Sequence, residues 1–78
     1  MYEKLMEAIS LNVVRITYEK NISLRKLSKD IGKNDGYIAR MLCGKFAPSL
    51  KTLCLIAEEL DITVSDLISL WPYKSYFG

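Results

Sequence analysis

The sequence predicts an all-α, compact five-helix bundle in one small domain, and three observations point to it. The chain has 78 residues, 50% hydrophobic and 26% charged, which fits one domain because domains rarely divide below about 50 residues. Helix caps and apolar residues at helical spacing mark five segments joined by short connections. No alternation of apolar and polar residues is long enough to compete as a strand.

The first predicted helix covers residues 2–20. Its apolar positions recur at steps of four, four and three residues, which is one stripe of an amphipathic helix. They are Leu5, Ile9, Val13 and Ile16. We expect this stripe to face the core.

The second predicted helix covers residues 24–31. Ser23 offers it an N-cap, and Ile22 and Leu27 have the spacing of a hydrophobic staple. Gly32 stands where a residue in the left-handed region ends a helix.

The third predicted helix covers residues 35–43. Asn34 is a good N-cap, and Asp35 suits the positive end of the helix dipole. Gly44 supplies the stop that follows.

The last two predicted helices cover residues 50–60 and 64–70. Ser49 opens the first of them. The second begins with a capping box at residues 63–66, and Pro72 forbids much continuation. Their apolar faces comprise Leu50, Leu53, Cys54, Ala57 and Leu60 in the first, and Val64, Leu67 and Ile68 in the second.

Composition excludes several classes of protein. The longest apolar run is five residues, 53–57, against about 20 needed to cross a bilayer, and the amino terminus lacks the apolar run of a secretory signal. We therefore expect a cytoplasmic protein with no membrane partner. Cys43 and Cys54 without any histidine cannot build a four-ligand zinc site. We expect no metal, no cofactor, and two reduced, packed thiols.

No enzyme is expected. Without histidine, acid–base or nucleophilic catalysis would rest on scattered Asp, Glu, Lys or Cys side chains, which form no nucleophile–base pattern. No glycine-rich phosphate loop is present in the sequence either.

Charge is unevenly distributed along the chain. Residues 1–19 carry two basic and three acidic side chains, residues 20–51 carry eight against two, and residues 52–78 carry one against four. The overall net charge of +2 therefore conceals a middle segment of +6. Such asymmetry points to a polyanionic partner, although a solvated charged surface accounts for it as well.

Residues 24–43 have the pattern of a helix-turn-helix. Ser28 is small where two crossing helices need close approach, and Gly32 makes the tight turn. The inner faces of the two helices comprise Leu27, Ile31, Ile38 and Met41. The second helix of such a pair fits the major groove of DNA, whose width admits one α-helix.

The chain also resembles a known family, the Xre-type or phage-repressor-like helix-turn-helix regulators. The likeness covers about residues 9–68 and runs through Ile9, Asn12, Val13, Ile16, Ile22, Ser23, Leu27, Ser28, Gly32, Asn34, Tyr37, Ile38, Ala39, Gly44, Lys45, Pro48, Ser49, Leu50, Leu53, Ile56, Ala57, Leu60, Asp66 and Leu67. It implies a lambda-repressor-like DNA-binding domain. Members are typically bacterial or phage transcription regulators that bind operator DNA as dimers, so the resemblance implies double-stranded DNA and a second copy as partners.

Carried over from the resemblance, Asp35, Gly36 and Arg40 are the residues that would face the bases. Arg40 is the foremost, because arginine makes the commonest specific contact, bidentate to guanine O6 and N7. Asp35 would either accept from cytosine N4 or satisfy the helix dipole. Gly36 either lets the backbone approach DNA closely or is tolerated without a role.

Further residues are candidate phosphate contacts. Arg25 and Lys26 stand in the first turn of a helix, where positive charge opposes the dipole, so a docked phosphate would remove the conflict. A solvated charged face is the alternative interpretation of this pair. Asn34 and Tyr37 flank the base readers and have side chains suited to phosphate hydrogen bonds. The remaining candidates are Ser23, Lys33 and Lys45.

The chain departs from the family pattern at three places. Leu24 replaces a glutamine that braces against phosphate, and Lys33 replaces an apolar residue of the turn. Thr17 and Leu42 replace a buried Arg–Glu pair. We expect these two side chains to touch in the core, because replacing a buried ion pair by apolar contact is often neutral or stabilising.

We expect residues 1–70 to form the DNA-binding domain and residues 71–78 to form an aromatic tail. The aromatic residues of the tail are Trp71, Tyr73, Tyr76 and Phe77. Such density needs burial, either as a homodimer interface or by folding back onto the same chain. We expect no small-molecule ligand domain.

These observations favour a sequence-specific regulator of transcription that binds double-stranded DNA. We expect a repressor that acts as a homodimer and reads the major groove with the helix at 35–43. The alternative is a protein-interaction module on the same fold, such as a toxin-neutralising or regulator-binding protein, because a fold does not fix a function.

Overall fold

Five helices follow one another in the computed structural model, which describes residues 1–69. They are α1 (Tyr2–Lys20), α2 (Leu24–Asp30), α3 (Tyr37–Leu42), α4 (Leu50–Glu59) and α5 (Val64–Ile68). No strand occurs in that part of the chain, so the all-α prediction is confirmed.

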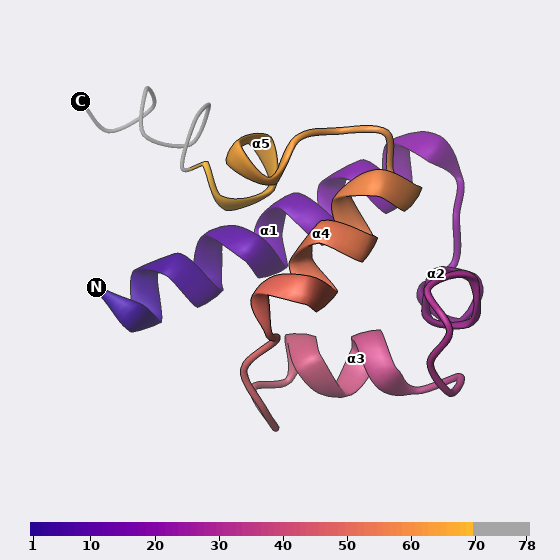
Figure 1. Cartoon of the computed structure of the whole chain (residues 1–78), viewed down its shortest axis with the longest axis horizontal. Coiled ribbons are helices and arrows are strands. Elements are labelled where there is room, and N and C mark those ends of the chain that lie inside the picture. Colours follow the sequence, from indigo (N-terminus) through magenta and orange to yellow (C-terminus); the bar gives the residue numbers. More distant parts are fainter. Residues whose placement is uncertain (70–78) are drawn as a thin grey trace.

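The helices form two pairs that meet at α4. α1 is by far the longest helix, and α5 packs against it, whereas α2 packs against α3 on the other side of the molecule (Figure 1). α4 contacts both α5 and α2. We call the two units the α1–α5 pair and the α2–α3 pair.

Left-handed residues end four of the helices. They are Asn21, Gly32, Gly44 and Asp61, with φ between 57° and 82°. After α2 the N–H of Gly32 donates to the carbonyl of Lys29, and the N–H of Lys33 donates to that of Ser28. These are the two hydrogen bonds of a Schellman motif, which a residue without Cβ adopts with least strain. The predicted helix ends at Gly32 and Gly44 are confirmed.

Side-chain oxygens cap three helix N-termini. Ser23, Ser49 and Thr63 each accept a hydrogen bond from the backbone N–H three residues on. At α5 the Asp66 carboxylate also accepts from the Thr63 N–H at 3.3 Å, so the predicted capping box is confirmed.

Two predicted boundaries are wrong by two residues, and the predicted ends of α2, α3 and α4 are each one residue too late. α3 begins at Tyr37 rather than at residue 35, and its N-cap is Gly36, without a side-chain cap. Asn34 does not cap the helix because its side-chain oxygen accepts a hydrogen bond from Arg40 instead. α5 ends at Ile68 rather than at residue 70, because Ser69 has extended backbone (φ −72°, ψ 138°).

One hydrophobic core joins all five helices. Its buried residues are Ile9, Val13, Ile16, Leu27, Ile31, Ile38, Met41, Ile56, Ala57, Leu60 and Leu67. Leu5 was expected to belong to this core but is 39% exposed. It lies in the first turns of α1, which extend beyond the bundle (Figure 1).

The buried face of α4 is rotated relative to the predicted face. Leu50 is 71% exposed, and Cys54 is also exposed, whereas Thr52 and Ile56 are buried. At about 100° per residue, positions 50 and 54 each lie about 160° from position 52, on nearly the opposite side of the helix. Cys43, on α3's outer side, is exposed as well. The prediction of packed thiols is therefore wrong, although neither cysteine is in a disulfide.

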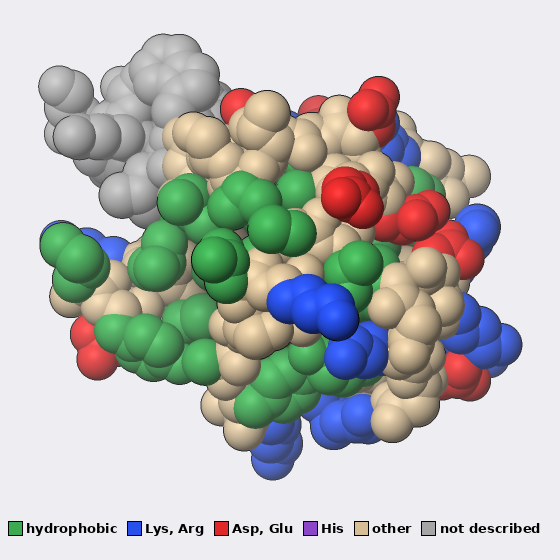
Figure 2. Space-filling view, in the orientation of Figure 1, with side chains coloured by type: hydrophobic (Ala, Val, Ile, Leu, Met, Phe, Trp, Pro, Cys, Tyr) green, Lys and Arg blue, Asp and Glu red, His purple; other side chains and the backbone are tan. Residues whose placement is uncertain are grey.

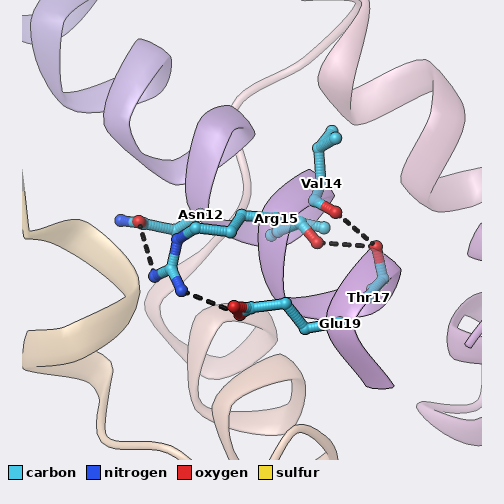
Figure 3. Close-up of polar contacts among 6 residues, drawn as sticks. Asn12, Val14, Arg15, Thr17 and Glu19 are labelled. Carbon is cyan, nitrogen blue, oxygen red and sulfur yellow. Dashed lines mark hydrogen bonds and ion pairs between the residues drawn. The ribbon is translucent and has the colours of Figure 1, made fainter. Parts of the chain in front are cut away.

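A buried asparagine in the middle of α1 joins this helix to the end of α5. The Asn12 side chain is fully buried, and its Nδ2 donates to the carbonyl oxygens of Leu67 and Ser69, each at 2.8 Å. Its Oδ1 accepts from Arg15 Nη2 at 3.3 Å, and Arg15 Nη1 lies 3.0 Å from Glu19 Oε1 (Figure 3). The Asn12 amide thus donates to the Leu67 carbonyl in the last turn of α5, where helix carbonyls lack intrahelical partners, and to the Ser69 carbonyl directly after α5.

Thr17 is buried near the C-terminal end of α1. Its hydroxyl donates to the carbonyl oxygens of Val13, at 2.7 Å, and Val14, at 3.1 Å, so its polar group is satisfied within its own helix (Figure 3). Leu42 is partly buried against the core. A direct contact between Thr17 and Leu42 stays a prediction.

No helix within residues 1–69 is both long and apolar enough to cross a membrane. The aromatic tail, with Trp71, Tyr73, Tyr76 and Phe77, lies outside the described residues. Its predicted dimer contact, and the boundary between residues 70 and 71, stay predictions.

Candidate nucleic-acid interface

A buried serine fixes the position of α3 against α2. Ser28 Oγ accepts from the backbone N–H of Ile38 at 3.0 Å and donates to the carbonyl of Leu24 at 2.8 Å. Ser28 is fully buried, and its bond with the Ile38 N–H is buried as well, whereas the bond to the Leu24 carbonyl is partly buried. A larger side chain would separate the two helices, and a side chain without oxygen would leave the Ile38 N–H unpaired. Position 28 therefore needs a side chain that is small, as predicted, and that also carries a hydrogen-bonding oxygen.

α3 has an inner and an outer face. Ile38 and Met41 are fully buried, as predicted for the inner face. The outer face is formed by positions three and four apart, namely Gly36, Ala39, Arg40 and Cys43. Sequence reasoning missed Ala39 and Cys43, although their spacing from Gly36 and Arg40 was the signal that would have found them.

Arg40, the foremost predicted base reader, is exposed on this outer face. Its guanidinium turns back toward the α2–α3 turn, where Nη2 donates to Asn34 Oδ1 at 2.7 Å. Gly36 lies directly beneath it, since a Cβ built at Gly36 would stand 2.8 Å from Arg40 Nη1. The structure therefore brings Asn34, Gly36 and Arg40 together.

Asp35 is not in the first turn of α3, so the alternative that it satisfies the helix dipole is wrong, whereas its base contact stays a prediction. It precedes α3, and its carboxylate oxygens lie 3.7 Å from Arg25 Nε and 3.7 Å from Lys29 Nζ, both on α2. The pairs are exposed, so each contributes little to stability. They place the Asp35 carboxylate beside α2, a position that sequence reasoning did not consider, and Lys29 was not among the predicted site residues.

Several predicted phosphate contacts already have partners within the protein. Ser23 Oγ caps α2 by accepting from the Lys26 N–H at 3.0 Å. Lys26 Nζ lies 2.8 Å from Asp30 Oδ2. The hydrogen bond to Asp30 and the negative charge of that carboxylate raise the pKa of Lys26 above its ordinary value of 10.5. Both partners of this pair lie at the surface of α2, within reach of solvent.

Tyr37 is partly buried, and its side chain already contacts other parts of the protein. Its ring packs against Phe46, with centroids 4.8 Å apart, and its hydroxyl lies 3.5 Å from Thr52 Oγ1. Lys33 Nζ lies 5.2 Å from the centre of the same ring, within the range of a cation–π contact. Tyr37 therefore anchors α3 to the loop before α4, while Lys33 and Lys45 remain at the surface.

Cationic side chains gather around the α2–α3 pair. Figure 2 shows Lys and Arg mainly along the side of the molecule where these helices lie. The exposed members are Arg25, Lys26, Lys29, Lys33, Arg40, Lys45 and Lys51. No group of acidic or sulfur ligands suited to a metal ion occurs within residues 1–69. The arrangement is suited to a polyanion with a groove wide enough for one helix.

Comparison with known proteins identifies one family. The family model described as helix-turn-helix (HTH_3) matches residues 14–67, which run from the middle of α1 to α5. No curated protein sequence matches the chain, and no solved structure does.

Proposed function

This chain belongs to the helix-turn-helix (HTH_3) family of DNA-binding regulators, and from that premise we propose that it is a repressor that reads operator DNA as a homodimer. In this proposal α3 lies in the major groove and Arg40 makes the principal base contact. The family is not an enzyme family, and we propose that the protein acts in the cytoplasm by occupying DNA.

The observation that carries the proposal is the outer face of α3. It presents the exposed guanidinium of Arg40, which lies across Gly36, beside the small residue Ala39, so that a base pair edge can approach the helix closely at Ala39. Arginine is bidentate to guanine O6 and N7, and an alanine methyl group fits against the thymine methyl. The helix pair behind this face is held rigidly by Ser28.

The cations on α2 support a backbone contact on either side of the reading helix. The ion pairs of Arg25 with Asp35 and of Lys26 with Asp30 are exposed, so a phosphate can compete for either cation at small cost. Such contacts position a protein on DNA without selecting sequence. We include Lys33 and Lys45 in the same group.

A homodimer is proposed because one small module buries limited surface on DNA, roughly 600–1,000 Å². Two copies related by a two-fold axis would place two α3 helices at half-sites about 34 Å apart. We propose the tail residues Trp71, Tyr73, Tyr76 and Phe77 as the contact between copies.

A protein-interaction module is the second candidate, and the outer side of α1 favours it. Val14 is 52% exposed and Tyr18 is 85% exposed on the face of α1 opposite the core. Exposed apolar side chains on one helix face suit a protein partner. A protein that used this face alone would not need the base-reading surface of α3.

Selection of bound duplexes from a random library tests the proposal. We expect the wild-type protein to enrich one sequence and Arg40→Ala to lose the preference at one base pair, by roughly 1–3 kcal/mol. Lys45→Ala is the matched control, because it removes a cation that contacts no base in the proposal. It should weaken all sequences equally and reduce the salt slope by about 1. Absence of any duplex binding at low salt would favour the interaction module instead.

A further inference from the structure

Asn34 and Gly36 both act on the Arg40 side chain. We infer that they are positioning residues, which hold the Arg40 guanidinium in a fixed orientation before DNA arrives. The inference rests on the proposed function, because it assigns these two residues to the base contact of Arg40. It also removes Asn34 from the group of phosphate contacts. Gly36 then leaves room for the Arg40 guanidinium, and it is not a point where the backbone approaches DNA.

The hydrogen bond to Asn34 is the first support. Arg40 Nη2 donates to Asn34 Oδ1 at 2.7 Å, at the short end of the range for a charged donor. The two residues stand on opposite sides of the start of α3, six positions apart in sequence. The contact therefore exists only when the α2–α3 turn is folded, and the backbone hydrogen bonds of Gly32 and Lys33 define that turn.

The position of Gly36 is the second support. A Cβ at this residue would lie 2.8 Å from Arg40 Nη1 and 3.7 Å from Cζ, so the guanidinium lies across the glycine. The φ of Gly36 is −94°, a value that any residue adopts. A Cβ here would displace the guanidinium, which is the far end of a flexible side chain, so glycine permits this orientation of Arg40 through the space it leaves and not through its backbone freedom.

The chemistry of the amide is the third support. A guanidinium has five N–H donors in a planar fork, and Asn34 accepts from Nη2. Donors remain for guanine O6 and N7, while the fork is held in one plane. A neutral amide orients the cation without neutralising it, whereas a carboxylate at the same position would compete with the base for its charge.

Ordering Arg40 before binding should raise the affinity for the specific sequence. An exposed arginine that becomes fixed on binding loses rotamer freedom, at a cost equivalent to about 2- to 12-fold in affinity. If Asn34 and Gly36 hold Arg40 in advance, this cost is already met in the free protein. The resulting gain in affinity applies to the specific complex alone, because only there does Arg40 contact a base.

The experiment compares bound duplexes selected by the wild type with those selected by Asn34→Ala, Gly36→Ala, Arg40→Ala and Lys45→Ala. Arg40→Ala should lose about 5- to 150-fold of preference at one base pair. Asn34→Ala and Gly36→Ala should lose about 2- to 12-fold at that same base pair, with an unchanged salt slope. The double variant Asn34→Ala/Arg40→Ala should lose no more than Arg40→Ala. Asn34→Asp should also lose preference, because the carboxylate binds the cation too tightly.

A second measurement needs no DNA. The Arg40 side-chain NMR signals should report greater mobility in Asn34→Ala than in the wild type, while the thermal unfolding midpoint stays nearly unchanged because all the groups involved are exposed or partly exposed. This separates a positioning role from a general loss of folding.

The inference is overturned if Asn34→Ala keeps the wild-type base preference. It is also overturned if Asn34→Ala weakens binding to every sequence equally and reduces the salt slope, because Asn34 would then be a phosphate contact. In either case loss of preference in Arg40→Ala would leave the proposed function intact. If the wild-type protein selects no sequence at all, the proposed function fails first and the inference falls with it.

Discussion

Each of the two helix pairs is held together by one fully buried polar side chain, but the two side chains act over different distances. Ser28 joins α2 to the first turn of α3, ten residues along the chain. Asn12 joins α1 to the end of α5, and its hydrogen-bond partners are 55 and 57 residues away. The serine sets a local angle between two short helices, whereas the asparagine closes the whole fold.

The difference indicates how a small domain divides its tasks. α2 and α3 have seven and six residues, too few to be stable as isolated helices. Their geometry therefore depends on Ser28, on the turn at Gly32 and on α4 behind them. α1 has 19 residues and supplies the surface on which the other end of the chain packs. Damage to Asn12 should affect stability alone, and damage to Ser28 should affect stability and DNA reading together.

The largest loss of stability is expected from a charge placed at a buried position of α1. Thr17→Arg puts a cation at a buried position of α1, and Leu42 replaces the acidic residue that pairs with such an arginine in the family pattern. We expect a loss of about 3–5 kcal/mol in the free energy of unfolding, measured by urea denaturation. Tyr18→Arg, at an exposed neighbouring position, is the control and should cost little. Full stability of Thr17→Arg would contradict the tight packing of this site.

The next effect concerns the asparagine itself. Asn12→Ala removes two hydrogen bonds to buried or partly buried carbonyl groups at the end of α5, and we expect a loss of about 2–4 kcal/mol. Arg15→Ala is the matched control, because it removes the contacts of Arg15 with the Asn12 oxygen and with Glu19 but leaves both carbonyl bonds of Asn12 in place, and it should cost less than about 1 kcal/mol. The base preference of the surviving folded protein should be unchanged. A changed preference would show that the two pairs are coupled.

A smaller loss of stability is expected for the serine, with a second consequence. Ser28→Ala leaves the buried Ile38 N–H without its acceptor and should lower the free energy of unfolding by about 1–3 kcal/mol. Because the same bond fixes the start of α3, the preference for operator over random DNA should fall as well. Ser65→Ala, on the exposed side of α5, should change neither quantity. Loss of stability with unaltered base preference would refute the link between Ser28 and the reading helix.

The smallest effect lies at the surface of α2. The Lys26 ammonium binds the Asp30 carboxylate, and this raises the pKa of Lys26 above 10.5. A raised pKa means that the stabilising contribution is fully present below the unfolded value and is lost as the pH rises through the folded value. Asp30→Asn should return the pKa to its ordinary value in an NMR titration. If Lys26 titrates identically in both proteins, the ion pair does not persist in solution.

Much of the fold was predictable because its signals are local. The caps at Ser23 and Thr63 and the stops at Gly32 and Gly44 depend on backbone groups within one helical turn, so residue type and spacing suffice to identify them. The inner faces of α2 and α3 were equally clear, since helical periodicity places Leu27 and Ile38 on one side. The outer face of α3 was only partly predicted, because Ala39 and Cys43 carry no chemistry that draws attention.

What the sequence by itself determined is therefore the set of helices, their stops, the helix-turn-helix and the basic character of the middle segment, because each depends on neighbours within a few positions. Tertiary structure alone decided where polar and charged groups find partners. Asn12 meets the carbonyls of Leu67 and Ser69, Asp35 lies beside Arg25 and Lys29 of α2, and Arg40 turns back onto Asn34 and Gly36. A side chain's partner depends on which backbone and charges the fold brings within hydrogen-bond distance, and that proximity is not encoded in local spacing.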